Sequence, residues 1–154
     1  MHDSQFMDRA LALAIRGIGC VEPNPPVGCV IVRDGEIVGE GFHEYFGAAH
    51  AEANALLAAG PQAAGSTAYV TLEPCCHHGK TPPCTQALIA AGVKRVVAAV
   101  QDPFPQVSGQ GIAELKATGI ACDVGVRAAE AEWLLAPYRK LITTQLMAFS
   151  TSSS

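Results

Sequence analysis

Charged residues are scarce in this 154-residue chain. Asp, Glu, Lys and Arg together make up 16% of it, whereas apolar residues make up 49%. The formal net charge is −4, so the chain lacks the basic excess that binds phosphate backbones, and we expect no nucleic-acid partner. A chain of this length can bury a substantial core as one domain, and its low charge favours a compact globular protein that forms a homo-oligomer.

Long apolar runs and targeting signals are also missing. No segment approaches the ~20 consecutive apolar residues of a membrane span. The first residues, Met-His-Asp-Ser-Gln, lack the basic and apolar regions of a signal peptide. We therefore expect a cytoplasmic protein with no membrane partner.

A disulfide framework is not expected either, although the chain has six cysteines. Without a secretory signal the thiols should stay reduced. Cys20, Cys29 and Cys122 stand in apolar surroundings, and we interpret them as small core residues. Cys75 and Cys84 flank a stretch that contains two histidines, which favours metal binding over disulfide formation.

One imidazole, two thiols and one carboxylate form the pattern around which the chain is organised. A catalytic zinc site uses three protein ligands and keeps a fourth position open, and His50, Cys75 and Cys84 supply that number. Residues i and i+2 of a helix point about 200° apart, so Glu52 can stand beside the metal without binding it. His-x-Glu followed by Pro-Cys and a second Cys is the signature of zinc nucleobase deaminases.

The spacing of Cys75 and Cys84 distinguishes among the families of zinc deaminases. Eight residues separate them, where the commonest signature has two. Residues 73–84 resemble the corresponding segment in the deaminase domain of the bifunctional riboflavin-biosynthesis enzymes. They read Glu-Pro-Cys-x-His-His-Gly-Lys-Thr-Pro-Pro-Cys. Residues 23–32 and 102–111 agree with that family, so the resemblance runs from Phe6 to Arg139.

The resemblance implies a hydrolase that needs one Zn²⁺ per chain. The implied substrate is 2,5-diamino-6-ribosylamino-4(3H)-pyrimidinone 5′-phosphate, a phosphorylated pyrimidine that loses its 2-amino group as ammonia. The product would be 5-amino-6-(5-phosphoribosylamino)uracil. Glu52 is the expected catalytic residue, which takes a proton from the attacking water and passes it to the ring nitrogen and the leaving amine.

The resemblance also implies a set of substrate contacts. They are Asn24, His43, Ala51, His77, Lys80 and Asp102. From the local sequence alone, Asn24 is better explained by a turn and the His77–Lys80 loop by a solvated loop, whereas His43 suits a surface position and a substrate contact equally. Lys80 is the preferred phosphate contact, because phosphate oxygens form charge-assisted hydrogen bonds. Two residues depart from the family pattern: Phe104 replaces the usual Asn, and Cys76 the usual Ser.

Hydrophobic patterns predict alternating helices and strands. The predicted helices span 4–17, 50–59, 81–91, 111–118 and 128–141, the last disturbed by Pro137. The predicted strands span 27–32, 36–41, 68–72, 94–100 and 120–126, with a hairpin turn at Asp34-Gly35. We therefore expect an α/β fold of the cytidine-deaminase-like type, a three-layer α-β-α sandwich around a mixed sheet of about five strands.

The sequence also predicts how the chain is divided into domains. Residues 1–145 are predicted to form the zinc-dependent pyrimidine deaminase domain, and the Ser-rich residues 146–154 a disordered tail. The bifunctional family continues into an NADPH-dependent reductase, whose glycine fingerprint is missing here, so either the reductase is a separate protein or the chain is a fragment or an altered reading frame.

Two rival functions stay open. The first is a zinc deaminase of another base or nucleotide, such as cytidine, guanine, deoxycytidylate or tRNA adenosine. The eight-residue spacing argues against it. The second is an inactive zinc-binding interaction module, which the intact Glu52 argues against.

Overall fold

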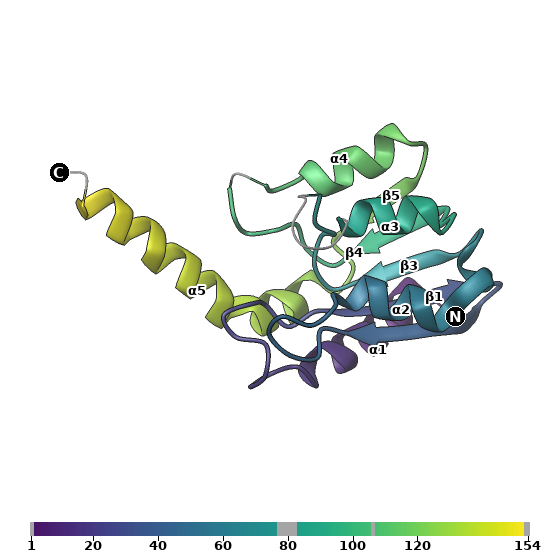
Figure 1. The fold of residues 1–154 in the computed structure, drawn as a ribbon, viewed down its shortest axis with the longest axis horizontal. Coiled ribbons are helices and arrows are strands. Elements are labelled where there is room, and N and C mark those ends of the chain that lie inside the picture. The colour runs from purple at the N-terminus through teal and green to yellow at the C-terminus, as the bar shows by residue number, and fades with distance from the viewer. Residues whose placement is uncertain (1, 77–82, 106, 153–154) are drawn as a thin grey trace.

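Five strands form one mixed sheet that carries helices on both faces (Figure 1). The computed structural model describes residues 2–76, 83–105 and 107–152, with side chains described up to residue 140. The strands lie in the order β2-β1-β3-β4-β5. Strand β1 is antiparallel to both neighbours, whereas β3, β4 and β5 are parallel. The strands are β1 (Gly28–Arg33), β2 (Glu36–Phe42), β3 (Thr67–Val70), β4 (Arg95–Ala98) and β5 (Ala121–Val124).

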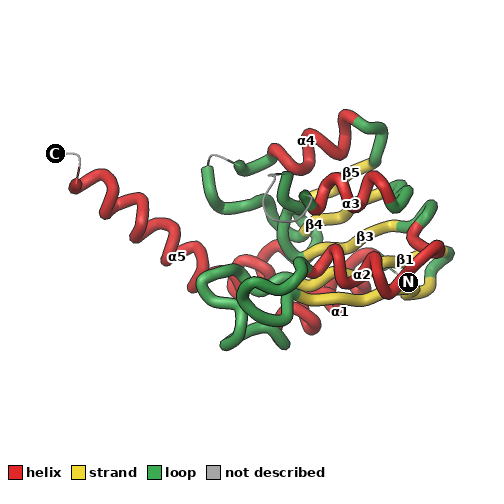
Figure 2. Tube along the Cα trace, in the orientation of Figure 1, coloured by secondary structure: helices red, strands yellow, loops and turns green. Residues whose placement is uncertain are grey.

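The helices complete the three layers, as Figure 2 shows by colour. Helix α1 and the start of α5 pack on one face of the sheet, whereas α2, α3 and α4 pack on the other. The predicted three-layer α/β sandwich is therefore confirmed. The helices are α1 (Asp3–Ile15), α2 (Ala51–Ala59), α3 (Cys84–Ala90), α4 (Gln110–Ala117) and α5 (Ala128–Ser152), with a short 3₁₀ helix at Gly60–Ala63.

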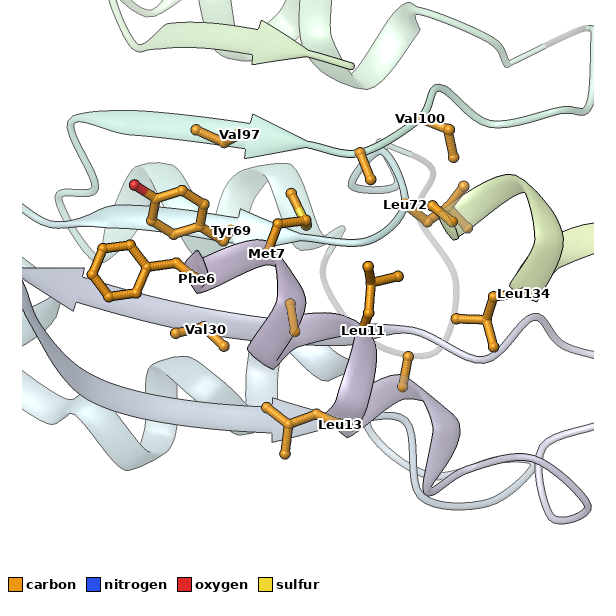
Figure 3. Close-up of a cluster of buried hydrophobic side chains, with 14 of the residues drawn as sticks. Phe6, Met7, Leu11, Leu13, Val30, Tyr69, Leu72, Val97, Val100 and Leu134 are labelled. Atoms are coloured by element: carbon orange, nitrogen blue, oxygen red, sulfur yellow. The ribbon is translucent and has the colours of Figure 1, made fainter. Parts of the chain in front are cut away.

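Alternation along the strands divides the core into two clusters, because successive side chains of a strand point to opposite faces. Val30 and Val32 of β1 face α1 and α5, whereas Cys29 and Ile31 face α2, α3 and α4. Figure 3 shows the first cluster, in which side chains of α1 lie against three adjacent strands. Burial on both faces makes the sheet a rigid platform for the loops at its edges.

The cysteines outside the metal motif only partly follow the prediction. Cys29 is fully buried, and Cys122 is partly buried against the second cluster. Cys20, by contrast, is exposed. It lies in the turns that follow α1, directly after Gly19, whose φ of 91° turns the chain back at the surface, so its interpretation as a core residue was wrong.

The predicted hairpin between β1 and β2 is confirmed. Its two turn residues, Asp34 and Gly35, have φ values of 54° and 78°. Positive φ at both central positions matches the twist of a tight β-hairpin, and Asp-Gly is a preferred pair for it.

Two glycines on β2 let α2 approach the sheet closely. A Cβ atom at Gly39 would lie 2.4 Å from the Ala55 carbonyl oxygen, and one at Gly41 would lie 2.5 Å from the Ala55 nitrogen. Only glycine permits this contact, because any larger side chain would push the helix away. The close packing fixes the start of α2, where His50 and Glu52 lie.

Helix α5 is longer than the sequence pattern predicted. Its first turns pack Ala131, Leu134 and Leu135 on the core, and the helix then extends away from the sheet (Figure 1). The helical backbone includes Pro137 and continues to Ser152, so the disordered tail expected from residue 146 is not seen in the described residues 146–152. Good helix formers are interspersed through residues 141–149, and they outweigh the serines near the end. None of the helices in the described parts of the chain has the length and apolar composition that a membrane crossing requires.

Candidate metal centre and active site

The candidate site lies at the edge of the sheet where β2, β3 and β4 end and β1 begins. Because β1 is antiparallel to both β2 and β3, these two strands run in the same direction. Their carboxyl ends lead to His43 and to Glu73–Cys75, and that of β4 leads to Asp102. Asn24 joins them from the loop before β1. The carboxyl ends of strands are the usual place for ligand sites in open α/β sheets.

The structure brings the three predicted metal ligands together. One ligand atom from each of His50, Cys75 and Cys84 lies within 4.8 Å of the others. His50 Nδ1 is 3.2 Å from Cys84 Sγ and 3.7 Å from Cys75 Sγ. A tetrahedral zinc ion with ordinary bond lengths separates such atoms by about 3.5–3.8 Å. Both the chemistry and the spacing of this donor set therefore fit zinc.

Hydrogen bonds within the cluster favour a thiolate at Cys75. The Cys84 side chain, and after it the His50 imidazole, lower the pKa of the Cys75 thiol to about 4. The backbone N–H of Cys84, the first residue of α3, also donates to Cys75 Sγ over 3.4 Å. The same pairing raises the pKa of Cys84, and the contact with Cys75 raises that of His50. These contacts favour the deprotonated form of Cys75, which is the form that binds metal.

Among the residues that the structure describes, the cluster contains three ligands and no fourth. Cys76 is the nearest further thiol in sequence, and its Sγ lies 3.9 Å from Gln110 Oε1 on α4. Burial raises the pKa of this thiol, which keeps it protonated. A three-ligand set leaves a position for water, the arrangement of catalytic rather than structural zinc sites.

Glu52 stands beside the ligands on the first turn of α2. Its side chain is only 4% exposed, and burial, with a smaller contribution from the Cys75 charge, raises its pKa to about 7. A buried carboxyl group of this kind is suited to exchanging protons near neutral pH. Its role as the proton carrier stays a prediction.

A cavity of about 180 Å³ opens over these groups. Three predicted contacts, Asn24, His43 and Asp102, line it together with His50, Glu52 and Cys75. A wider surface groove of about 530 Å³ lies between α1 and α5, but mainly apolar side chains line it. The convergence of polar groups therefore marks the smaller cavity as the candidate active site.

His43 is buried and fixes the orientation of Asn24. Its Nδ1 lies 3.1 Å from the Ala49 carbonyl oxygen, which can only accept, so Nδ1 carries the proton. Nε2 then accepts a hydrogen bond from the Asn24 amide nitrogen over 3.2 Å. This turns the Asn24 oxygen away from His43, available to accept from a ligand. The alternative that His43 is an incidental surface residue is excluded, because its side chain is 4% exposed.

The remaining predicted contacts have different surroundings. Asp102 Oδ1 accepts a hydrogen bond from the backbone N–H of Phe104 over 2.9 Å, a bond that does not depend on the side chain at position 104. The replacement of the family's Asn by Phe104 therefore preserves this turn. Ala51 is fully buried, and its side chain packs in the core beneath α2. His77 and Lys80 lie outside the described residues.

Sequence reasoning missed two polar residues that line the cavity, Glu73 and Tyr138. Glu73 directly precedes Pro74 and Cys75, and this position at the end of a buried strand was a signal that could have revealed it. Tyr138 follows Pro137 in a terminal helix and had no local signal. Burial, and then the charge of Asp102, raise the pKa of the Tyr138 phenol.

Comparisons with known proteins agree with this geometry. Residues 1–100 match the family model described as the cytidine and deoxycytidylate deaminase zinc-binding region. The riboflavin biosynthesis protein RibD of Escherichia coli (strain K12) is 58% identical over 144 residues, which are 94% of this chain and 39% of that protein. The diaminohydroxyphosphoribosylamino-pyrimidine deaminase of Buchnera aphidicola subsp. Schizaphis graminum (strain Sg) is 50% identical over 132 residues, which are 86% of this chain and 90% of that protein.

Among solved structures, RibD of Acinetobacter baumannii (form 1) superposes with a TM-score of 0.89 at 50% identity. The match covers 92% of this chain and 40% of that one. The chain therefore spans less than half of the RibD relatives that it matches, but nearly all of the shorter Buchnera enzyme.

Proposed function

Since this chain belongs to the zinc-binding cytidine and deoxycytidylate deaminase family, and within it to the RibD-type diaminohydroxyphosphoribosylaminopyrimidine deaminases, we propose that it deaminates 2,5-diamino-6-ribosylamino-4(3H)-pyrimidinone 5′-phosphate. The products would be 5-amino-6-(5-phosphoribosylamino)uracil and ammonia, in riboflavin biosynthesis. One observation carries the proposal: the buried Glu52 carboxyl group lines the same cavity as His50 and Cys75, two of the three clustered ligands.

In this mechanism the chain's own residues bind the substrate and move protons. Zinc, held by His50, Cys75 and Cys84 at one ion per chain, would supply the Lewis acid that makes water nucleophilic at neutral pH. Glu52 would accept one proton of the attacking water and pass it to the ring nitrogen, and would then carry the second proton, from the hydroxyl group of the tetrahedral adduct, to the leaving amine. The second transfer matters because the amine departs readily only as neutral ammonia.

The size of the cavity suggests how the substrate would lie. Its volume of about 180 Å³ is below the roughly 300–1,000 Å³ of pockets that enclose drug-sized ligands. We infer that it encloses the pyrimidine ring, whose N–H groups can donate to the Asn24 oxygen, while the ribose phosphate extends beyond it. Contacts of His77 and Lys80 with the phosphate stay predictions from the sequence. A contact with Ala51 would involve its backbone, because its side chain is buried in the core.

An ammonia-release assay tests the proposal. Purified zinc-loaded protein is given the diaminopyrimidinone phosphate, cytidine, guanine and deoxycytidylate in parallel. We expect turnover of the first substrate to exceed that of the others. Faster turnover of deoxycytidylate would overturn the substrate but keep the chemistry, whereas zinc-loaded protein inactive on all four would support the interaction-module alternative.

Four wider expectations remain proposals beside this one. They are the deaminase domain at residues 1–145, a homo-oligomeric state, action together with a reductase on a separate chain, and a cytoplasmic location. Light scattering on the purified protein tests the oligomeric state. Adding a reductase to the assay and following consumption of the deaminated product tests the reductase partner.

A further inference from the structure

Glu73 is a buried residue that lines the cavity, and its carboxylate holds a loop by the backbone of that loop. It is 5% exposed and lies three residues after the end of β3. Its Oε1 accepts hydrogen bonds from the backbone N–H groups of Asp102 (3.0 Å) and Gly109 (2.9 Å). Its Oε2 accepts from the N–H of Ile112 over 3.1 Å. One side chain therefore binds both ends of the segment 102–112.

Close packing beside Glu73 leaves this segment no room to shift. A Cβ atom at Gly111 would lie 2.1 Å from the Pro74 carbonyl oxygen and 3.3 Å from the Glu73 side chain. Only glycine allows the start of α4 to approach the chain at this distance. The hydrogen bonds of Glu73 and the close packing at Gly111 therefore both hold the loop against Pro74, which precedes the ligand Cys75.

The loop that Glu73 holds carries Asp102, which lines the cavity. The backbone nitrogen of Asp102 is bound to Glu73, and its side chain is bound to Phe104 N–H, so the residue is fixed at two points. A proton carrier needs an oxygen that substrate or water can reach. Both Glu73 oxygens already accept from backbone N–H groups, so the carboxylate is engaged in holding the loop.

We infer that Glu73 is a positioning residue, which sets the place of Asp102 in the cavity and thereby the binding of substrate. The inference rests on the proposed deaminase function. A carboxylate is required because all three partners are donors. An amide at this position would turn its NH₂ group toward one of them and lose that bond.

The variant Glu73→Gln tests this role, with Glu114→Gln as the matched control. Glu114 lies on α4, but its carboxylate pairs with the side chain of Gln86 instead of backbone groups. We expect Glu73→Gln to keep its zinc, to lower kcat/KM by about 10- to 100-fold mainly through KM, and to speed hydrogen exchange over residues 102–112. The control should change none of these quantities by more than about 3-fold.

A cycle with Asp102→Ala separates positioning from direct action. If Glu73 acts through Asp102, Glu73→Gln should cost less than about 3-fold in the Asp102→Ala background. A full loss in that background, or a fall in kcat at unchanged KM, would show instead that Glu73 acts on the reaction itself.

Hydrogen exchange of the wild-type protein tests the clamp even should Glu73→Gln fail to fold. The Asp102, Gly109 and Ile112 amides should exchange much more slowly than that of Tyr45, which lies in an exposed loop. Equal rates would overturn the clamp. Wild-type protein that does not turn over the pyrimidinone phosphate would contradict the proposed function, while this exchange measurement would still decide the role of Glu73.

Discussion

At the scale of single residues, the candidate site separates metal binding from proton transfer. Of the three ligands, His50 directly precedes α2, Cys75 lies in the loop after β3, and Cys84 is the first residue of α3. Glu52 is the second residue of α2. Each group can therefore be removed without touching the other, and the two removals should have different outcomes.

Replacing one ligand should release the metal. We expect Cys84→Ala to lose most of the roughly one zinc per chain that three ligands of this type imply. Elemental analysis after gel filtration measures the zinc content. Cys20→Ala is the control, since this exposed cysteine lies in the turns after α1, and it should keep its zinc. Unchanged zinc in Cys84→Ala would contradict the assignment of this thiol.

Replacing Glu52 should stop turnover but keep the metal. We expect Glu52→Gln to bind zinc normally and to lower kcat by at least ~10²-fold, the low end of the range for a general acid–base group. Glu44→Gln, in an exposed position of the loop before α2, should retain wild-type kcat. A kcat close to normal in Glu52→Gln would mean that another group carries the proton.

At the scale of elements, local patterns were sufficient for most of the fold. The hairpin at Asp34-Gly35, the apolar strand that became β1 and the helical spacing of α1 are all properties of short segments, and the structure confirms them. The close approach of α2 to Gly39 and Gly41 is tertiary, and no local pattern encodes which helix lies on a glycine. The three metal ligands were found because their spacing is itself a motif.

The features that the sequence did not predict depend on tertiary contacts. Glu73 is recognisable as a clamp only once residues 102–112 fold back onto it. Tyr138 reaches the cavity because α5 packs beside the loop of Asn24, which is far away in sequence. Helix α5 itself was underestimated because Pro137 is normally a strong helix breaker.

Tyr138 should contribute to substrate binding as the cavity residue supplied by α5. We expect Tyr138→Ala to raise KM by roughly 3- to 10-fold, the value of an aromatic contact, with little change in zinc content. Tyr45→Ala is the control, because Tyr45 is 59% exposed and does not belong to the described lining of the cavity. An unchanged KM in Tyr138→Ala would show that Tyr138 only forms part of the cavity wall and does not contribute to substrate binding.

At the scale of the whole molecule, one ionic network ties the first helix to the sheet. Arg95 of β4 donates to both carboxylate oxygens of Asp3 at 3.0 and 2.8 Å, and also to Asp123 of β5. The Tyr69 hydroxyl on β3 donates to Asp3 as well. The Arg95 contact first, and then the Tyr69 hydrogen bond, lower the pKa of Asp3 to about 2.

This network should make stability depend on acid pH. The pKa of Asp3 is lower in the folded chain than the ~3.9 of an unfolded one, so its stabilisation is complete above that value and disappears as the pH falls toward 2. Because the Asp3 side chain is partly exposed, we expect Asp3→Asn to lower Tm by only about 1–4 °C at pH 7.

Scanning calorimetry between pH 7 and pH 2.5 measures the difference in Tm between Asp3→Asn and wild type. The difference should shrink as the solution becomes more acidic. Glu36→Gln, at an exposed position on the edge strand β2, should show no such trend. If the difference in Tm stays constant with pH, the effect of Asp3 comes from helix capping and not from its ionised carboxylate.

The strand directions have a practical consequence for engineering. Because the candidate site occupies one edge of the sheet, the turns that contain Gly35, Gly65, Gly92 and Gly119 lie at the opposite edge, each with positive φ. Loop tips of this kind tolerate insertions and chemical attachment well. A fluorophore or a solid support attached at the Asp34-Gly35 turn would leave the cavity facing solution, so the protein could be tethered without covering its candidate site.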